Sequence, residues 1–136
     1  MTAENVKKGK EIFFALNCNS CHVESFTTGD FGSHANLKNQ IIYPYSDFLL
    51  HDMGESLSDG VSEFLAQGSE WRTPPLWGIG LTSIVSDEYG YLHDGRARTI
   101  EEAILWHGGE ANEIIQNYKK LKKSEVNQLL SFINSL

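Results

Sequence analysis

Apolar positions near the start of the chain have the spacing of one helix face. They recur at steps of three and four residues, the period that places side chains on one side of a helix: Val6, Gly9, Phe13 and Leu16. The pattern predicts a first helix that leads directly into the segment "LNCNSCHVESF". A glycine inside a helix costs stability relative to alanine, so we expect another element to cross closely at Gly9.

The C-terminal segment "KKSEVNQLLSFINSL" is the candidate for that crossing. Ser124 stands where the N-cap of a helix is expected. The apolar residues that follow again have helical spacing: Val126, Leu129, Leu130 and Ile133. We therefore predict a terminal helix that packs on the first one, with the ring of Phe132 against Gly9.

A third helix is predicted in "TIEEAILWHGG", over about residues 100–107. Thr99 and Glu102 have the spacing of a capping box at its start, and Gly108 with Gly109 ends it.

The long middle part of the chain, residues 24–98, shows no sustained period. It is rich in Gly, Ser, Asp and Pro, which indicates long ordered loops with short helices rather than further long elements. A stretch of this length in a compact domain requires something central that organises it. Together with the three helices, this predicts an all-α fold with long ordered loops.

The composition narrows the possible functions. The chain has 136 residues, 40% of them hydrophobic and 21% charged, which fits one globular domain over residues 1–136. Its formal net charge of −7 argues against nucleic-acid binding, which needs a basic face. No apolar run approaches the roughly 20 residues of a membrane span, and the first residues lack the apolar centre of a secretion signal. We expect a soluble chain without a transmembrane segment, whose Met1 is a start added to a trimmed mature sequence or isolated domain.

Both cysteines of the chain lie in the pattern C-x-x-C-H, formed by Cys18, Cys21 and His22. This is the attachment pattern of c-type haem, in which two thiols add to the porphyrin vinyl groups and the adjacent imidazole reaches the iron. A thioredoxin-like dithiol normally follows a strand in a βαβ pattern, whereas here a helix precedes it. A zinc site needs more ligands, and a plain disulfide leaves His22 without a role. The motif favours one covalent haem c, ligated by His22, in a class I-like cytochrome c domain.

A six-coordinate iron needs a second ligand, and helical spacing favours His107. The apolar face of the predicted third helix continues onto this histidine at positions i, i+3, i+4 and i+7: Ile100, Ala103, Ile104 and His107. A buried imidazole without a partner costs on the order of 1–3 kcal/mol. Iron coordination removes that cost, while a carboxylate or carbonyl fixes the other ring nitrogen.

Other residues compete for the same position. Met53 is the main rival, because His/Met is a common ligand pair in cytochromes. His51 and His93 precede turns that contain Asp and Gly, which favours a role in bracing loops. His34 has no supporting periodicity, so we expect an exposed loop residue there.

Two arginines near aromatic residues and turns are candidates to pair with the haem propionates. They are Arg72 in "EWRTPPLWG" and Arg96, with Arg98 close by, in "HDGRART". Guanidinium groups bind carboxylates through charge-assisted hydrogen bonds. An ordinary surface ion pair is the alternative for each.

Five blocks of the chain are long enough together to carry a family resemblance: "CNSCH", "LLHDMGESLSDG", "EWRTPPLWGIGL", "YLHDGRARTIEEAILWHGGEA" and "LLSFINSL". From about residue 6 to the end, they resemble the C-terminal haem domain of the bacterial di-haem oxidoreductases, often labelled peroxidases or thiol oxidoreductases. More distant relatives are the di-haem cytochrome c peroxidases and the di-haem enzyme that matures the tryptophan tryptophylquinone cofactor.

The resemblance implies further properties. In those relatives a turn similar to "LHDG" precedes a helix that begins like "TIEE", and this helix supplies a methionine or tyrosine ligand at the position of His107. The family's haem is attached outside the cytoplasm, which implies a periplasmic protein. Its members carry a second C-x-x-C-H domain upstream, which this chain does not contain.

The leading hypothesis is a one-electron-transfer domain with a bis-histidine haem. Its partner would be a redox protein or an upstream haem domain. A haem closed by two histidines cannot bind peroxide without losing a ligand, so catalysis is the alternative: a haem peroxidase or thiol oxidoreductase in which His107 is displaced and His93 or Glu110 handles protons. A haem-based sensor is a third possibility.

Overall fold

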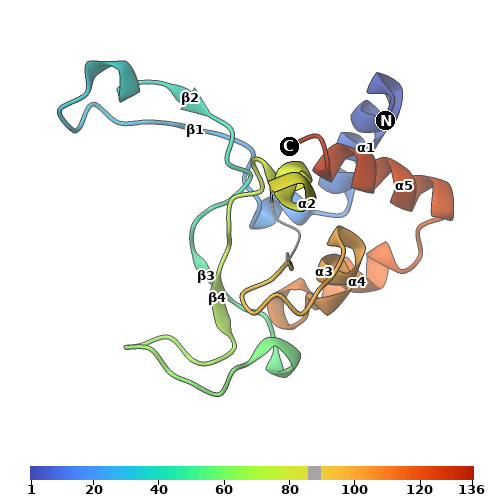
Figure 1. Ribbon diagram of the computed structural model, residues 1–136. Coiled ribbons are helices and arrows are strands. Elements are labelled where there is room, and N and C mark those ends of the chain that lie inside the picture. Colours follow the sequence, from blue (N-terminus) through green and yellow to red (C-terminus); the bar gives the residue numbers. More distant parts are fainter. Residues whose placement is uncertain (86–89) are drawn as a thin grey trace.

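The structure is a computed structural model that describes residues 1–85 and 90–136 (Figure 1). The helices in these ranges are α1 Ala3–Ala15, α2 Thr82–Val85, α3 Ile100–Trp106, α4 Asn112–Tyr118 and α5 Lys123–Ile133. The strands are β1 Phe26–Thr27, β2 Ile41–Ile42, β3 Leu50–Asp52 and β4 Glu70–Arg72. They form two antiparallel pairs, β1 with β2 and β3 with β4. The prediction of an all-α, class I-like fold is therefore wrong, because the described residues form a mixed α/β structure.

The two terminal helices form the packed centre of the molecule. α1 and α5 cross at Gly9, which is buried. A Cβ atom at this position would overlap the backbone carbonyl of Gln128 and lie 2.7 Å from Cβ of Phe132. The predicted crossing of the terminal segment at Gly9, with Phe132 against it, is confirmed.

The main core forms around this crossing. Phe13 of α1 meets Phe132 of α5 edge to face, with ring centroids 5.3 Å apart. The aromatic ring of Tyr45 closes the group from the middle of the chain, 5.7 Å from Phe132. Burial of these apolar surfaces is the largest favourable term available to the fold. The buried members of this core are Phe13, Leu16, Tyr45, Leu76, Ile100, Tyr118, Val126, Leu129, Phe132 and Ile133.

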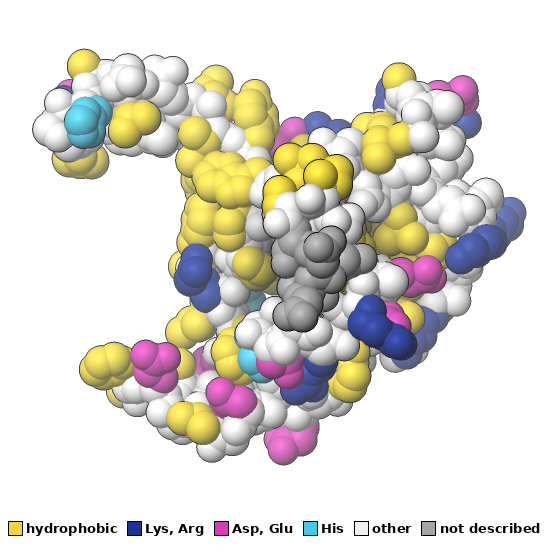
Figure 2. Space-filling view, in the orientation of Figure 1, with side chains coloured by type: hydrophobic (Ala, Val, Ile, Leu, Met, Phe, Trp, Pro, Cys, Tyr) yellow, Lys and Arg dark blue, Asp and Glu magenta, His cyan; other side chains and the backbone are white. Residues whose placement is uncertain are grey.

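Both sheets belong to segments that project from the core. In Figure 1 the β1–β2 pair and the β3–β4 pair extend to one side of the helices, each ending in a long connection. The tips carry apolar side chains in solvent, since Phe31 is 91% and Phe64 is 99% exposed. Figure 2 shows apolar side chains along the β1–β2 segment and at its base. The strands have two or three residues, too few for an alternating pattern in the sequence.

The helix ends differ in detail from their predicted form. At α3, the Thr99 hydroxyl accepts the N–H of Glu102 at 3.0 Å, as predicted. The Glu102 carboxylate, however, accepts the N–H of Arg98 at 2.7 Å and not that of Thr99. The N-cap of α5 is Lys122, whose N–H donates to the Glu125 carboxylate at 2.7 Å, so the assignment of Ser124 as N-cap is wrong.

Candidate functional site

The cysteines lie on a tight turn at the end of α1. Asn17 has a left-handed backbone (φ 66°), which ends the helix and starts a 3₁₀ turn at Cys18–Ser20. The His22 N–H then donates to the Cys18 carbonyl at 3.0 Å, so the turn holds Cys18, Cys21 and His22 close together.

The chemistry of the two thiols argues against the rival readings of the motif. Both cysteines are free, so no disulfide joins them. Burial raises the pKa of Cys18 to about 12 and also raises that of Cys21. A reactive redox dithiol needs a lowered thiol pKa, because the thiolate is the nucleophile.

A metal site of protein ligands has one candidate trio among the described residues. Potential donor atoms of Cys21, Asp47 and His51 lie within 4.8 Å of one another. Asp47 and His51 already bond to each other, and Cys18 is not part of the group. The trio therefore does not explain the pair of cysteines.

His22 is held by a carbonyl from a distant part of the chain. Its Nδ1 lies 2.9 Å from the carbonyl oxygen of Tyr45. Because a carbonyl only accepts, Nδ1 carries the proton and Nε2 keeps its lone pair. Burial lowers the pKa of His22 to about 4, against the opposing effect of the Tyr45 hydrogen bond. The neutral ring with a free Nε2 is the form that binds a metal.

His107 is prepared in the same way by its own helix. It is the C-cap of α3, and its Nδ1 lies 2.7 Å from the carbonyl oxygen of Ala103, one turn earlier. Burial lowers its pKa as well. The predicted helix limit of residue 107 is thus one residue too long, and the backbone of His107 already leaves the helix.

The two imidazoles lie close together at the site. The ring centroids of His22 and His107 are 6.5 Å apart, with planes inclined by 46°. Two imidazoles on opposite sides of one metal ion, each with a metal–nitrogen bond of about 2 Å, have centres roughly 6–7 Å apart. Since both Nδ1 atoms are bound to carbonyls, the Nε2 atoms are the available donors. The residues present therefore fit a haem whose iron would be held by His22 and His107 beside the two thiols.

The full length of the chain, residues 1–136, matches the family model described as "di-haem oxidoreductase, putative peroxidase". The chain belongs to the di-haem oxidoreductase family. Membership makes it a haem-binding oxidoreductase, as the resemblance implied. Comparisons with curated proteins and with solved structures returned no match. No helix in the described part of this di-haem oxidoreductase is long and apolar enough to cross a membrane.

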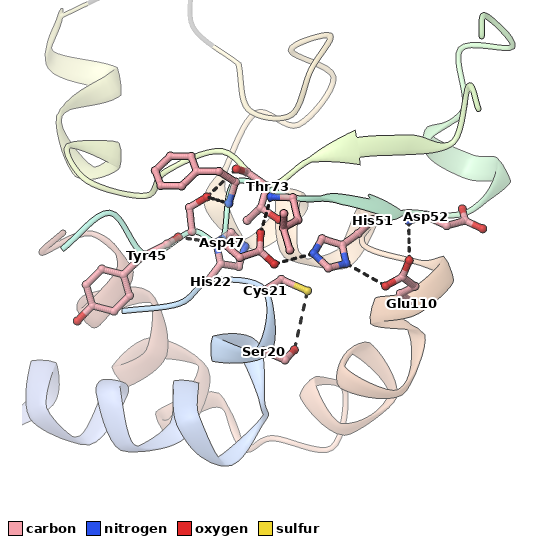
Figure 3. A network of polar contacts seen from close by, with 12 residues as sticks. Ser20, Cys21, His22, Tyr45, Asp47, His51, Asp52, Thr73 and Glu110 are labelled. Atoms are coloured by element: carbon pink, nitrogen blue, oxygen red, sulfur yellow. Dashed lines mark hydrogen bonds and ion pairs between the residues drawn. The ribbon is translucent and has the colours of Figure 1, made fainter. Parts of the chain in front are cut away.

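A polar network beside the C-x-x-C-H motif was not predicted as a unit from the sequence (Figure 3). His51 lies between two carboxylates, with Nε2 2.8 Å from Asp47 and Nδ1 2.9 Å from Glu110. Glu110 also accepts the N–H of Asp52 at 2.9 Å. His51 does join loops, as its sequence context indicated. Its partners Asp47 and Glu110 lie 4 and 59 residues away in the sequence, and no local pattern predicts the contact with Glu110.

The remaining ligand candidates occupy different surroundings. Met53 contributes backbone to the site, because its carbonyl oxygen would lie 2.9 Å from a Cβ atom at Gly108. His93 stacks on Trp71, with centroids 3.5 Å apart. His34 is exposed on the connection between β1 and β2, as predicted.

The two arginines differ in how they are engaged. Arg96 binds the Asp94 carboxylate through Nε at 2.6 Å, donates to the Ser56 carbonyl and lies over the Trp106 ring. Arg72, at the end of β4, is exposed and enters no ion pair within the described ranges. Of the two, Arg72 is the one with a guanidinium group left for an external anion.

Proposed function

We propose that this chain carries one covalently attached haem c and transfers single electrons. Cys18 and Cys21 would form the thioethers, and His22 with His107 would be the axial ligands. The observation that supports this most strongly is the 6.5 Å separation of the two imidazole centroids, in rings whose Nδ1 atoms are each bound to a backbone carbonyl. When bound, the haem supplies the Fe(II)/Fe(III) couple.

The protein residues fix the ligands before any electron moves. The carbonyls of Tyr45 and Ala103 hold the ring planes and the tautomers, so Nε2 of each histidine is directed away from its own backbone. Burial keeps both rings neutral, since it lowers both pKa values. A pair of ligands held in place changes little with oxidation state, which favours rapid electron transfer.

The surroundings of the site complete the proposal. Arg72 is the better candidate to bind a haem propionate. Arg96 would bind a propionate only after releasing the carboxylate of Asp94. We take residues 1–136 as a single domain whose electrons come from a redox protein or another haem domain. We further propose that the protein is periplasmic, because the c-type haem of the proteins it resembles is attached outside the cytoplasm.

Peroxidase or thiol oxidoreductase chemistry is the second candidate, and the family description supports it. His107 lies just outside α3 and is followed by two glycines, so its loop is where a ligand exchange would occur. Glu110, three residues further on, is the nearest carboxylate in sequence to handle a proton.

The haem content of the purified, matured protein tests the leading proposal. We expect a mass increase of one haem, an alkaline-pyridine spectrum typical of two thioethers, and loss of attachment in Cys18→Ala/Cys21→Ala. Cyanide and peroxide should leave the ferric spectrum unchanged on the time scale of mixing. Rapid turnover of peroxide with an artificial electron donor would instead support the second candidate.

A further inference from the structure

The side chain of His51 connects two loops that would hold the haem ligands (Figure 3). It extends from β3 and is 17% exposed. Both ring nitrogens face carboxylate oxygens, Asp47 at 2.8 Å and Glu110 at 2.9 Å. An imidazole donates from both nitrogens only as the cation, and hydrogen bonds between two charged groups are the stronger kind. His51 therefore joins the two acids more firmly than a neutral side chain would.

Asp47 belongs to the segment that holds His22. Its backbone N–H donates to the carbonyl of Cys21 at 2.8 Å, directly before the histidine. Two residues earlier, the Tyr45 carbonyl accepts the Nδ1 proton of His22. The Asp47 side chain is 11% exposed, and its other oxygen accepts the N–H of Leu49 at 2.9 Å. The position of Asp47 is thus coupled to the backbone directly before His22 and, through the neighbouring Tyr45 carbonyl, to the His22 ring.

Glu110 belongs to the segment of His107, three residues after it. While one carboxylate oxygen meets His51, the other accepts the N–H of Asp52 at 2.9 Å. Next to it, the backbone of Gly109 approaches that of Asp52 so closely that a Cβ atom on Gly109 would overlap the Asp52 carbonyl. The end of β3 is therefore docked against the His107 loop, and His51 reaches from there to the other side of the site.

We propose that His51 is a positioning residue, which ties the His22 segment to the His107 segment through Asp47 and Glu110 and so holds His107 on the iron. The inference rests on the proposed function, because it concerns the two residues assigned there as ligands. The hydrophobic core already fixes α3 relative to α1. We call the bonded group Asp47, His51 and Glu110 the clamp. It acts on the loop beyond α3, where His107 has left the helix.

Replacement of His107 by cyanide in the ferric protein measures the strength of this clamp. His51→Phe keeps a ring of similar size but removes both hydrogen bonds, and it should raise the cyanide binding rate roughly five- to tenfold. Glu110→Ala removes the bond to a carboxylate that is 56% exposed. It should raise the rate by less, roughly threefold. The double variant should exceed His51→Phe by less than the full effect of Glu110→Ala, because both changes break the His51–Glu110 bond and only the Glu110–Asp52 bond is lost in addition.

Controls and a second readout separate positioning from general loosening. His34→Phe, on an exposed connection, should leave the rate unchanged. Ferric electron paramagnetic resonance should show altered g-values in His51→Phe and Glu110→Ala, since the ring orientation of His107 changes. If His51→Phe does not fold, Glu110→Ala alone still tests the clamp.

The possible outcomes separate the two proposals. Unchanged cyanide rates and g-values in variants that retain low-spin haem would overturn the clamp while leaving the proposed function intact. Rate effects that multiply in the double variant would also overturn it. A native protein without low-spin haem would overturn both proposals.

Discussion

The two histidines of the site depend on backbone carbonyls at very different distances along the chain. His107 bonds the carbonyl of Ala103, four residues earlier, and His22 bonds that of Tyr45, 23 residues later. The first partner follows from helix geometry alone. The second exists only because the chain returns past the C-x-x-C-H motif after the β1–β2 segment. Both contacts prepare the same neutral tautomer with Nε2 as the donor atom.

Removal of the His107 side chain should change the spin state of the ferric iron and leave the haem attached. In His107→Ala, the ferric absorption spectrum should become partly high-spin, because one axial position is then open to water. The haem content per chain should be unchanged, since Cys18, Cys21 and His22 remain. His51→Ala and Met53→Ala provide comparisons. A low-spin spectrum in His107→Ala together with a high-spin one in Met53→Ala would transfer the assignment to Met53.

Tyr118 should make the stability of the protein sensitive to alkaline pH. Burial, with the nearby charge and hydrogen bond of Glu101, raises the pKa of Tyr118 to about 12. The unfolded value is about 10, so this contribution to stability is complete below pH 10 and is lost as pH rises towards 12. The loss is on the order of 2 kcal/mol. Urea unfolding at several pH values should show a smaller alkaline loss in Tyr118→Phe, and equal losses would contradict the prediction.

Residue patterns led to the candidate cysteines and histidines of the site, but not to the contacts that support them. The C-x-x-C-H spacing and the helical position of His107 are local, so they can be read without a structure. Tyr45, Asp47 and Glu110 act through contacts between segments that are far apart in sequence. Nothing in their own neighbourhoods distinguishes them from other loop residues.

At the scale of elements, the contact between α1 and α5 holds the molecule together. The three long periodic segments were predicted correctly because each buries one face of a helix. The β-strands were missed because they are short and lie in segments with no alternating pattern. Caps were less predictable than helices, as Ser124 and Glu102 show, since several nearby polar groups can satisfy the same N–H.

Gly9→Ala should destabilise the protein although alanine favours helices. The intrinsic gain is about 1 kcal/mol, but the added Cβ overlaps the Gln128 backbone and forces α1 and α5 apart. Overpacking of this kind costs about 1–3 kcal/mol, so we expect a net loss of up to about 2 kcal/mol in urea unfolding. Lys7→Ala, at an exposed position of the same helix, should change the free energy by less than about 0.5 kcal/mol. A stabilised Gly9→Ala would show that the helices cross elsewhere.

The whole molecule consists of a helical core with two projecting strand pairs (Figure 1). Its mixed architecture did not follow from composition or periodicity, because the projecting segments contribute little to the core. Residues 24–43 supply none of the buried core residues. The long middle region, predicted as ordered loops, thus also contains two short antiparallel strand pairs that lie outside the helical core.

The β1–β2 connection should be dispensable for stability. Replacement of residues 28–40 by the two-residue turn Asn-Gly would connect Thr27 to Ile41 through a tight hairpin turn. These two residues are already opposite each other in the antiparallel β1–β2 pair. We expect a change of less than about 1 kcal/mol in the free energy of unfolding and unchanged haem content. Leu129→Ala, at a side chain that is 1% exposed, should lose about 2–5 kcal/mol in the same assay. Unfolding of the shortened chain would show that the connection belongs to the core.

The axial ligation of the resting ferric protein tests the central claim most directly. Low-temperature electron paramagnetic resonance combined with near-infrared magnetic circular dichroism distinguishes bis-imidazole iron from the alternatives. We predict a single low-spin species with two imidazole ligands, His22 and His107. A high-spin resting signal would contradict the account, and so would a sulfur-to-iron charge-transfer band that assigns Met53 as the second ligand.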